Sequence, residues 1–231
     1  MDSNVLPNIL WVLGAAGLGF LAAAVFAGTL KLRRQLFLVP YVLMSGSFVA
    51  TYLIWSRTSI EDLLLDNLLW GVAAAAFIGA LLVKNVLSQA SSPRQRGPGF
   101  VADVMWSGVV YGTIDSLLLS VLPVMATKEA LAGLDLGSDL ATDIVVGVSA
   151  LGASVFVTVA YHAGYPEFRN RSMRFPAMGI TLSTVGYLLA SNPIASIGSH
   201  AAMHVAAVVR GPDKTIQLPP HYDAGASRGH R

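Results

Sequence analysis

Seven long runs of apolar residues dominate this sequence and take up well over half of its 231 residues. A helix needs about 20 residues to cross the hydrocarbon core of a bilayer, which is about 30 Å thick. The runs therefore predict an all-α polytopic membrane protein, a bundle of seven transmembrane helices, and leave no room for a separate soluble catalytic domain. The predicted spans are 6–30, 35–55, 63–83, 100–125, 142–163, 175–190 and 194–209.

The composition agrees with a lipid environment and excludes several kinds of chemistry. Charged residues make up 12% of the chain, against about 25% in an average soluble domain. The chain has no cysteine, which excludes disulfides, thiolate nucleophiles, cysteine-ligated iron–sulfur clusters and covalently attached haem. The net charge of +2 argues against nucleic acid as a partner. We expect an integral protein of a prokaryotic plasma membrane, with the lipid bilayer as its main partner.

The distribution of basic residues predicts the orientation. Of the 15 Lys and Arg residues, all but Arg57 and Lys128 fall in the loops after the first, third and fifth spans or in the C-terminal tail. Basic residues collect on the cytoplasmic side of a membrane protein. We therefore expect the N-terminus outside and the C-terminus in the cytoplasm. The first span is too long for the apolar region of a signal peptide, so we expect the chain to retain it.

Two segments rich in Gly, Pro and Ser divide the chain. Residues 88–99 are predicted to form a cytoplasmic linker between a three-helix N-terminal part, 1–87, and a four-helix C-terminal part, 100–210. Residues 211–231 have the composition of a flexible cytoplasmic tail. The C-terminal part is the one expected to carry the functional site.

Polar side chains within the predicted spans are concentrated on three of the four C-terminal helices. Residues four apart on a helix lie on nearly the same face, so each of these spans presents one polar stripe. Ionisable groups are costly in lipid and mark functional sites. The first two spans hold no ionisable residue, and we expect them to lie outside the site. The stripes are Asp103, Ser107, Tyr111 and Asp115; Ser154, Thr158 and His162; and Ser196, His200 and His204.

Asp115 lies within the fourth span, and the apolar spans hold no Lys or Arg that would neutralise it. It must therefore be protonated, hydrated, bound to a metal ion or paired with a histidine. Counting depth at about 1.5 Å per residue from the cytoplasmic end of each span places His200 about 14 Å and Asp115 about 20 Å deep, where the two could meet. The same count places His162 and His204 near Asp103. Either aspartate could complete the site, whereas hydroxyl members of the stripes are also explained by bonds to the carbonyl four residues back.

The order of these residues resembles the intramembrane CAAX-protease and bacteriocin-processing (CPBP) family. Its members carry Glu-Glu-x-x-x-Arg on one span, Phe-x-x-x-His on the next and His-x-x-x-Asn two spans later. In this chain 111–119 falls at the first motif, 158–162 at the second and 200–204 at the third. An Ile-Asp pair replaces the glutamates, and leucine, threonine and histidine replace the family's Arg, Phe and Asn. The resemblance covers about half of the chain.

The resemblance implies a divergent intramembrane hydrolase that cleaves peptide bonds in a membrane-associated peptide or protein and needs no obligatory cofactor. The carboxylate would activate water as a general base, and the histidines would orient the water or stabilise the oxyanion. The catalytic residues implied in this way are Asp115, His162, His200 and His204.

The residues themselves leave other functions open. His200 and His204 point the same way from one helix, so together with His162 and Asp103 they could hold a divalent metal ion and leave a position for water. A b-type haem could be held between His162 and either of the other two histidines. A transporter could use the same stripes as a proton or ion path. A metal- or haem-binding membrane protein or transporter without protease activity is therefore the alternative to the hydrolase.

Overall fold

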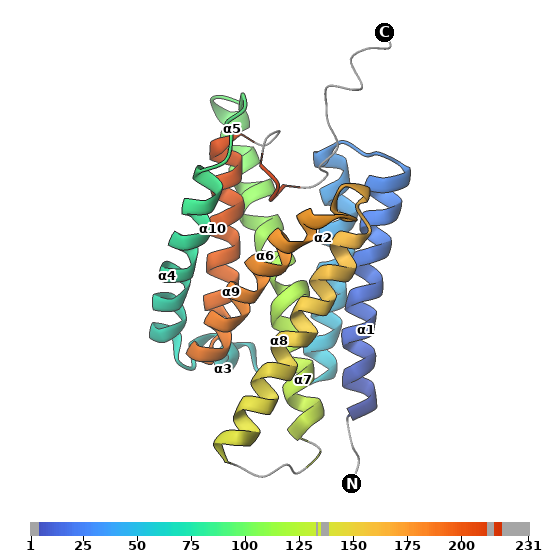
Figure 1. Ribbon diagram of the computed structural model, residues 1–231, viewed down its shortest axis with the longest axis vertical. Helices are drawn as coiled ribbons and strands as arrows, with labels where there is room; N and C mark the ends of the chain where they lie inside the picture. Colours follow the sequence, from blue (N-terminus) through green and yellow to red (C-terminus); the bar gives the residue numbers. More distant parts are fainter. Residues whose placement is uncertain (1–4, 133, 135–138, 212–214, 219–231) are drawn as a thin grey trace.

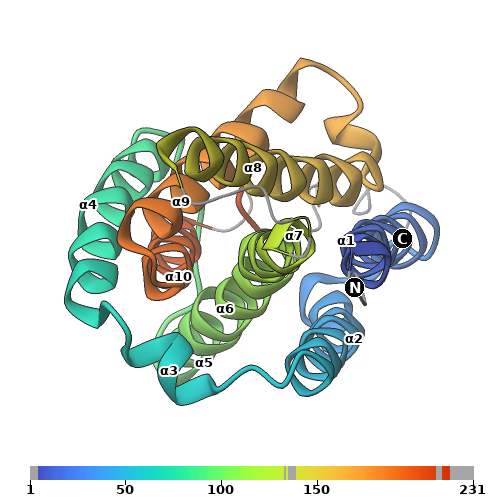
Figure 2. The same cartoon turned by 90° about the horizontal axis from the view of Figure 1, so that it is seen from below.

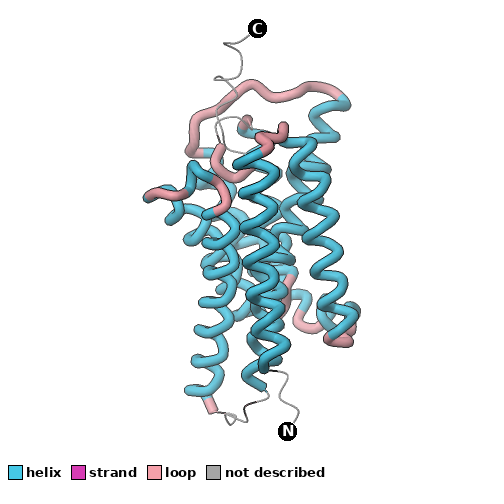
Figure 3. Tube along the Cα trace, turned by 90° about the vertical axis from the view of Figure 1, so that its right-hand side faces the viewer, coloured by secondary structure: helices cyan, strands magenta, loops and turns pink. Residues whose placement is uncertain are grey.

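A computed structural model describes residues 5–132, 134, 139–211 and 215–218. Among these residues all regular structure is helical, and the long helices run side by side in one bundle (Figures 1 and 3). The first helix, α1, continues into a π-helical turn, and short 3-10 turns at Pro166–Phe168 and Arg171–Met173 join α8 to α9. The bounds are α1 Val5–Ala22, its π-helical turn Ala23–Thr29, α2 Arg34–Trp55, α3 Ile60–Leu65, α4 Leu68–Leu87, α8 Leu140–Ala163, α9 Arg174–Ala190 and α10 Ile194–Arg210.

One continuous helix of 35 residues, Pro98–Ala132, forms the centre of the bundle. Figure 2 shows it along the bundle axis, with α8, α9, α10, α4, α2 and α1 arranged around it. It is the most buried of the long apolar helices. The helix changes its winding along its length, through α5 Pro98–Asp103, a π-helical turn Val104–Val110, α6 Tyr111–Ser116, a second π-helical turn Leu117–Val121 and α7 Leu122–Ala132.

Five of the described helices are long and apolar enough to cross a membrane, which confirms the coarse prediction of an all-α protein built from membrane-type helices. The five are Val5–Thr29, Arg34–Trp55, Leu68–Leu87, Pro98–Ala132 and Leu140–Ala163. Helices also form at the two remaining predicted spans, but α9 and α10 have 17 residues each. A helix of 17 residues is about 26 Å long, a little less than the thickness of a bilayer core.

The outer surface of the bundle carries large apolar side chains that remain exposed among the described residues. Ile54 is 78% exposed, Leu69 80% and Leu189 83%. Soluble proteins rarely expose contiguous apolar surface on this scale. A helical bundle satisfies its backbone hydrogen bonds internally and can present such a surface to lipid. The apolar surface and the helix lengths therefore both indicate a membrane environment.

The two predicted parts of the chain contribute to the same bundle. Helix α4, from the N-terminal part, packs along α10, and α1 packs along α8. The linker segment lies against the end of α10, where the Arg94 guanidinium donates to the Val209 carbonyl over 2.7 Å. Of the predicted tail, the described residues 211 and 215–218 are packed, with Thr215 and Leu218 buried. Residues 219–231 lie outside the described residues.

Local signals in the sequence explain where α8 and α10 begin. The Asp139 carboxylate accepts a hydrogen bond of 2.8 Å from the Thr142 amide, and bonding to this amide lowers the pKa of that carboxyl below its usual value. Before α10, the fully buried Asn192 donates to the carbonyls of Leu64 and Asp66 and accepts from the Ile194 amide. Asn192 therefore ties the start of α10 to the loop before α4.

Candidate functional site

Asp115 is placed at the midpoint of the central helix and is 2% exposed. The short segment α6 that carries it has a π-helical turn on each side. Such turns insert an extra residue into a helix and often occur at functional sites, because they redirect side chains. The local winding therefore supports a functional role for this aspartate.

Two glycines let α10 approach the central helix closely. A Cβ atom at Gly112 would lie 2.9 Å from the Ala201 Cα and 3.0 Å from the His204 Cδ2. A Cβ atom at Gly108 would lie 2.8 Å from a methyl carbon of Val205. Small residues four apart are the usual means by which membrane helices bring their backbones together. The two glycines thus place the histidines of α10 directly against the helix that carries the aspartate.

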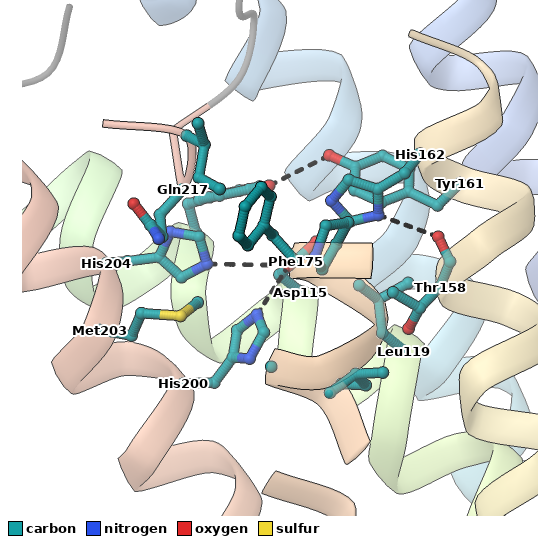
Figure 4. A pocket seen from close by; sticks show the side chains of 15 residues that line it. Asp115, Leu119, Thr158, Tyr161, His162, Phe175, His200, Met203, His204 and Gln217 are labelled. Atoms are coloured by element: carbon teal, nitrogen blue, oxygen red, sulfur yellow. Dashed lines mark hydrogen bonds and ion pairs between the residues drawn. The ribbon is translucent and has the colours of Figure 1, made fainter. Parts of the chain in front are cut away.

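The Asp115 carboxylate is the centre of a buried polar group (Figure 4). Its Oδ2 accepts a hydrogen bond from His200 Nε2 over 2.9 Å, and His204 Nε2 lies 3.8 Å from the same oxygen. Its other oxygen, Oδ1, accepts a hydrogen bond of 2.5 Å from the Tyr41 hydroxyl. Of the states expected for an aspartate without a basic neighbour, the structure shows pairing with histidine.

Asp115, His200 and His204 also have the composition and spacing of a metal site. One ligand atom from each lies within 4.8 Å of the other two, and all three residues are buried. Within the residues that the structure describes, neither ring nitrogen of His204 has a hydrogen-bond partner, and nor has Nδ1 of His200. Buried polar atoms are nearly always paired, and each exception calls for a reason such as a bound ion. Two histidines and one carboxylate are a common ligand set for zinc and for iron.

His162 lines the same cavity from α8. Its Nδ1–H donates to the Thr158 carbonyl over 2.9 Å, which leaves the lone pair on Nε2. In Figure 4 the ring lies across the cavity from His204. His162 is not one of the three residues whose ligand atoms cluster. It is therefore placed to accept a proton in the cavity rather than to complete the cluster.

A cluster of buried tyrosines surrounds the carboxylate. The Tyr165 hydroxyl donates to the Tyr161 hydroxyl over 2.6 Å, and the hydroxyls of Tyr161 and Tyr111 lie 3.0 Å apart. The Tyr111 ring meets the His204 ring edge to face, with 4.8 Å between their centres. A chain of hydroxyl groups strengthens the donor at its end. Tyr111, which also lines the cavity, can thus act as a hydrogen-bond donor beside the histidines.

The cavity beside this group has a volume of about 50 Å³. A single water molecule needs roughly 10–15 Å³ on this measure, so the cavity admits a few waters or a small part of a substrate. Its walls are mostly apolar and include Leu119, Ile180 and Met203. The C-terminal segment adds Ile216 and Gln217 to its lining.

The Gln89 side chain holds the C-terminal segment beside the cavity. The Ile216 amide donates to Gln89 Oε1, and Gln89 Nε2 donates to Gln217 Oε1, each over 3.2 Å. Gln89 follows α4, so this contact joins two segments that lie far apart in the sequence. It was not predicted, because the composition of the tail predicts flexibility.

The structure brings four of the five predicted site residues to one cavity: Asp115, His162, His200 and His204. Asp103 is not among the residues that line it. It lies 12 residues from Asp115 on the same helix, which corresponds to about 18 Å, beside a different pocket near Arg34. The depth count that placed Asp103 beside His204 assumed that all spans end at one level, whereas the close contacts of Gly108 with Val205 and of Gly112 with His204 place His204 about two turns deeper than Asp103.

The expectation that the first two helices lie outside the site is only partly correct. No described residue of either helix lines the cavity, but Tyr41 on α2 donates directly to Asp115. A tyrosine hydroxyl needs a partner when it is buried, even in an otherwise apolar helix. A buried hydroxyl in an otherwise apolar span is the signal that could have identified it. The Gly108-x-x-x-Gly112 pair in the fourth span is a second signal that was present in the sequence.

No protein-family model, no curated protein and no solved structure matches this chain. The resemblance to the CPBP family therefore rests on the quoted residues and on the order of the spans alone.

Proposed function

We propose that this chain is an integral membrane hydrolase whose Asp115, His200 and His204 bind a divalent metal ion, with zinc as the expected metal. The observation that carries the proposal is the clustering of three ligand atoms within 4.8 Å at a buried position. The ring nitrogens of His204, which have no hydrogen-bond partner among the described residues, support it, because a bound ion would give one of them a partner. Zinc with three protein ligands keeps a fourth position for the water that attacks the substrate.

The contacts of the carboxylate suit a metal ligand. Tyr41 donates to its Oδ1, which is the supporting hydrogen bond that metal ligands usually have. His200 Nε2 would ligate the ion after its proton moves to Nδ1, which has no partner among the described residues. Asp115 Oδ2 would then be free to ligate the same ion. The metal would supply an acidic water and a Lewis acid.

The remaining polar residues of the cavity have roles in the proposed hydrolysis of a peptide bond. His162 accepts a proton from the attacking water at Nε2, and the water oxygen forms a bond to the carbonyl carbon. The Tyr111 hydroxyl donates a hydrogen bond to the oxyanion that forms. The same proton then moves to the leaving amine as the C–N bond breaks. The substrate in this proposal is a membrane-associated peptide or protein.

The cavity argues against the haem alternative. Pockets for ligands of drug size or larger have volumes of about 300–1,000 Å³, whereas this cavity has about 50 Å³. The small volume therefore favours a bound metal ion over a bound haem.

The metal is tested by elemental analysis of the purified protein. We expect about one equivalent of zinc per chain, removed by a strong chelator and restored by added zinc. Stoichiometric iron would contradict hydrolysis and support oxidation chemistry, because two histidines and a carboxylate also form the iron site of oxygenases. Absence of any metal after growth and purification without chelators, together with no binding of added zinc, would refute the proposed site.

We further propose seven spans with the N-terminus outside, which places the end of the bundle with Ser172 in the cytoplasm. The scarcity of basic residues on the other side, which holds only Arg57 and Lys128, supports this orientation. The chain has no cysteine, so single cysteines can be introduced without background. Ser172→Cys should react with a membrane-impermeant maleimide only in opened cells, and Leu134→Cys in intact cells. The reverse pattern would overturn the orientation, and labelling of both in intact cells would overturn the span count.

A further inference from the structure

A second pocket, separate from the metal site, lies at the end of the bundle where α4 and α10 finish. It has a volume of about 750 Å³ and is much more open than the first. Three arginines line it, and the other lining residues are serines, proline and two aliphatic residues. The lining residues are Leu87, Ser91, Ser92, Pro93, Arg94, Arg96, Val209 and Arg210.

We propose that this pocket binds the phosphate headgroup of an anionic phospholipid. The lining holds no aspartate or glutamate. Arg94 and Arg210 donate to the backbone carbonyls of Val209 and Gln89, which are neutral partners. Within the part of the chain that the structure describes, no carboxylate forms an ion pair with these arginines. Three cations without a counter-charge among the described residues favour an anion, and guanidinium groups match phosphate oxygens in geometry.

The arginines are held in place by the fold. Arg94 donates one N–H to Val209 and also stacks over the Phe100 ring at 5.0 Å. Its remaining N–H groups are available, because a guanidinium carries five donors. The loop is fixed against α10 at Gly211, whose backbone has φ of 122° and has no room for a Cβ atom beside Ser92. These contacts fix the shape of the pocket within the fold.

The position and shape of the pocket favour a lipid over a free anion. Leu87 is 45% exposed and Val209 38% exposed, and both lie on the membrane side of the arginines at the ends of α4 and α10. Basic pockets between membrane helices, with apolar surface beneath them, are typical sites for anionic headgroups. A volume of about 750 Å³ also exceeds what inorganic phosphate would fill and suits a headgroup with its glycerol.

The proposal is tested on the full-length chain by native mass spectrometry in a mild detergent. We add phosphatidylglycerol or phosphatidylcholine at equal concentration and measure the fraction of protein with bound lipid. Phosphatidylglycerol should be retained preferentially, and Arg94→Gln with Arg96→Gln should weaken its binding by about tenfold or more, since each basic group at the membrane surface contributes substantially. Equal retention of the two lipids by the unmodified protein would overturn the proposal.

Control variants separate the pocket from general charge and from misfolding. Arg33→Gln with Arg171→Gln removes the same charge from the same end of the bundle, outside the pocket, and should leave binding unchanged. Arg96→Gln alone leaves the fold intact, because no contact of the described structure depends on Arg96, and it should still weaken binding. Equal loss in the control pair would contradict a specific site.

Soluble competitors distinguish a lipid from a free anion. Inorganic phosphate and glycerol 3-phosphate, at the concentration of the lipid, should not displace phosphatidylglycerol. Displacement by either would show that the pocket is a site for a soluble phosphate and would refute the lipid proposal. None of these measurements uses the metal site, so their outcome is independent of the proposed hydrolase.

Discussion

Asp115→Asn and His204→Ala are each expected to remove the stabilisation that zinc gives to the protein. An ion that binds only the folded state stabilises it by about 4 kcal/mol at a thousandfold excess over Kd. For a chain of 231 residues this corresponds to a rise of about 10 °C in Tm. Loss of one of three ligands should lower zinc affinity by more than about a hundredfold, which exceeds the usual effect of a supporting residue. The measurement is the Tm in detergent with zinc and with chelator.

The control for this experiment is Ser183→Ala. Ser199 donates to the Ser183 hydroxyl over 3.2 Å, so the variant loses a buried hydrogen bond near the site but no ligand. Ser183→Ala should lower the free energy of unfolding by about 1 kcal/mol with or without zinc, and it should retain the full zinc-dependent rise in Tm. If the ligand variants instead lose stability in chelator and keep the zinc-dependent rise, then Asp115 and His204 are structural and the metal proposal fails.

Hydropathy and four-residue spacing were sufficient to predict much of the fold and part of the site. A helix in lipid must satisfy its backbone internally, so apolar runs of the right length leave few alternatives to a helical bundle. A stripe of polar residues on such a helix must turn toward other polar residues or water. For that reason the three histidines could be predicted to share one pocket with Asp103 or Asp115, although the choice between the two aspartates stayed open.

The contacts that depend on packing between distant segments could not be predicted in the same way. The Tyr41 contact requires the rotation of α2 about its axis, which its nearly uniform apolar surface does not determine. The position of Asp103 requires the relative heights of the helices, which hydropathy gives only to within a turn or two. The position of Gln217 in the lining of the cavity requires the pairing of the C-terminal segment with Gln89, a contact between residues 128 positions apart. The composition of that segment alone predicts a flexible tail.

The close approach of α10 to the central helix predicts opposite effects for two chemically identical substitutions. Gly112→Ala adds a Cβ atom 2.9 Å from the backbone of Ala201, a separation at which one of the two helices must move. Gly152→Ala, on α8, adds a Cβ atom with nothing within 4 Å. Alanine is preferred over glycine in a helix by about 1 kcal/mol. Gly152→Ala should therefore be neutral or stabilising, whereas overpacking at Gly112 should cost about 1–3 kcal/mol.

Gly112→Ala should also reduce the affinity for zinc, although the added methyl group contacts no ligand atom of Asp115 or His200. The added methyl group at Gly112 would lie 3.0 Å from the His204 Cδ2, so relief of the clash moves that ring. A displacement of about 1 Å is enough to impair a preorganised site by about a hundredfold. Zinc titration of the two alanine variants measures this effect, with the Gly152 variant binding as the unmodified protein does. Equal stability and equal zinc affinity of the two variants would show that α10 does not pack closely against the central helix at Gly112. That result would also contradict the proposed geometry of the metal site.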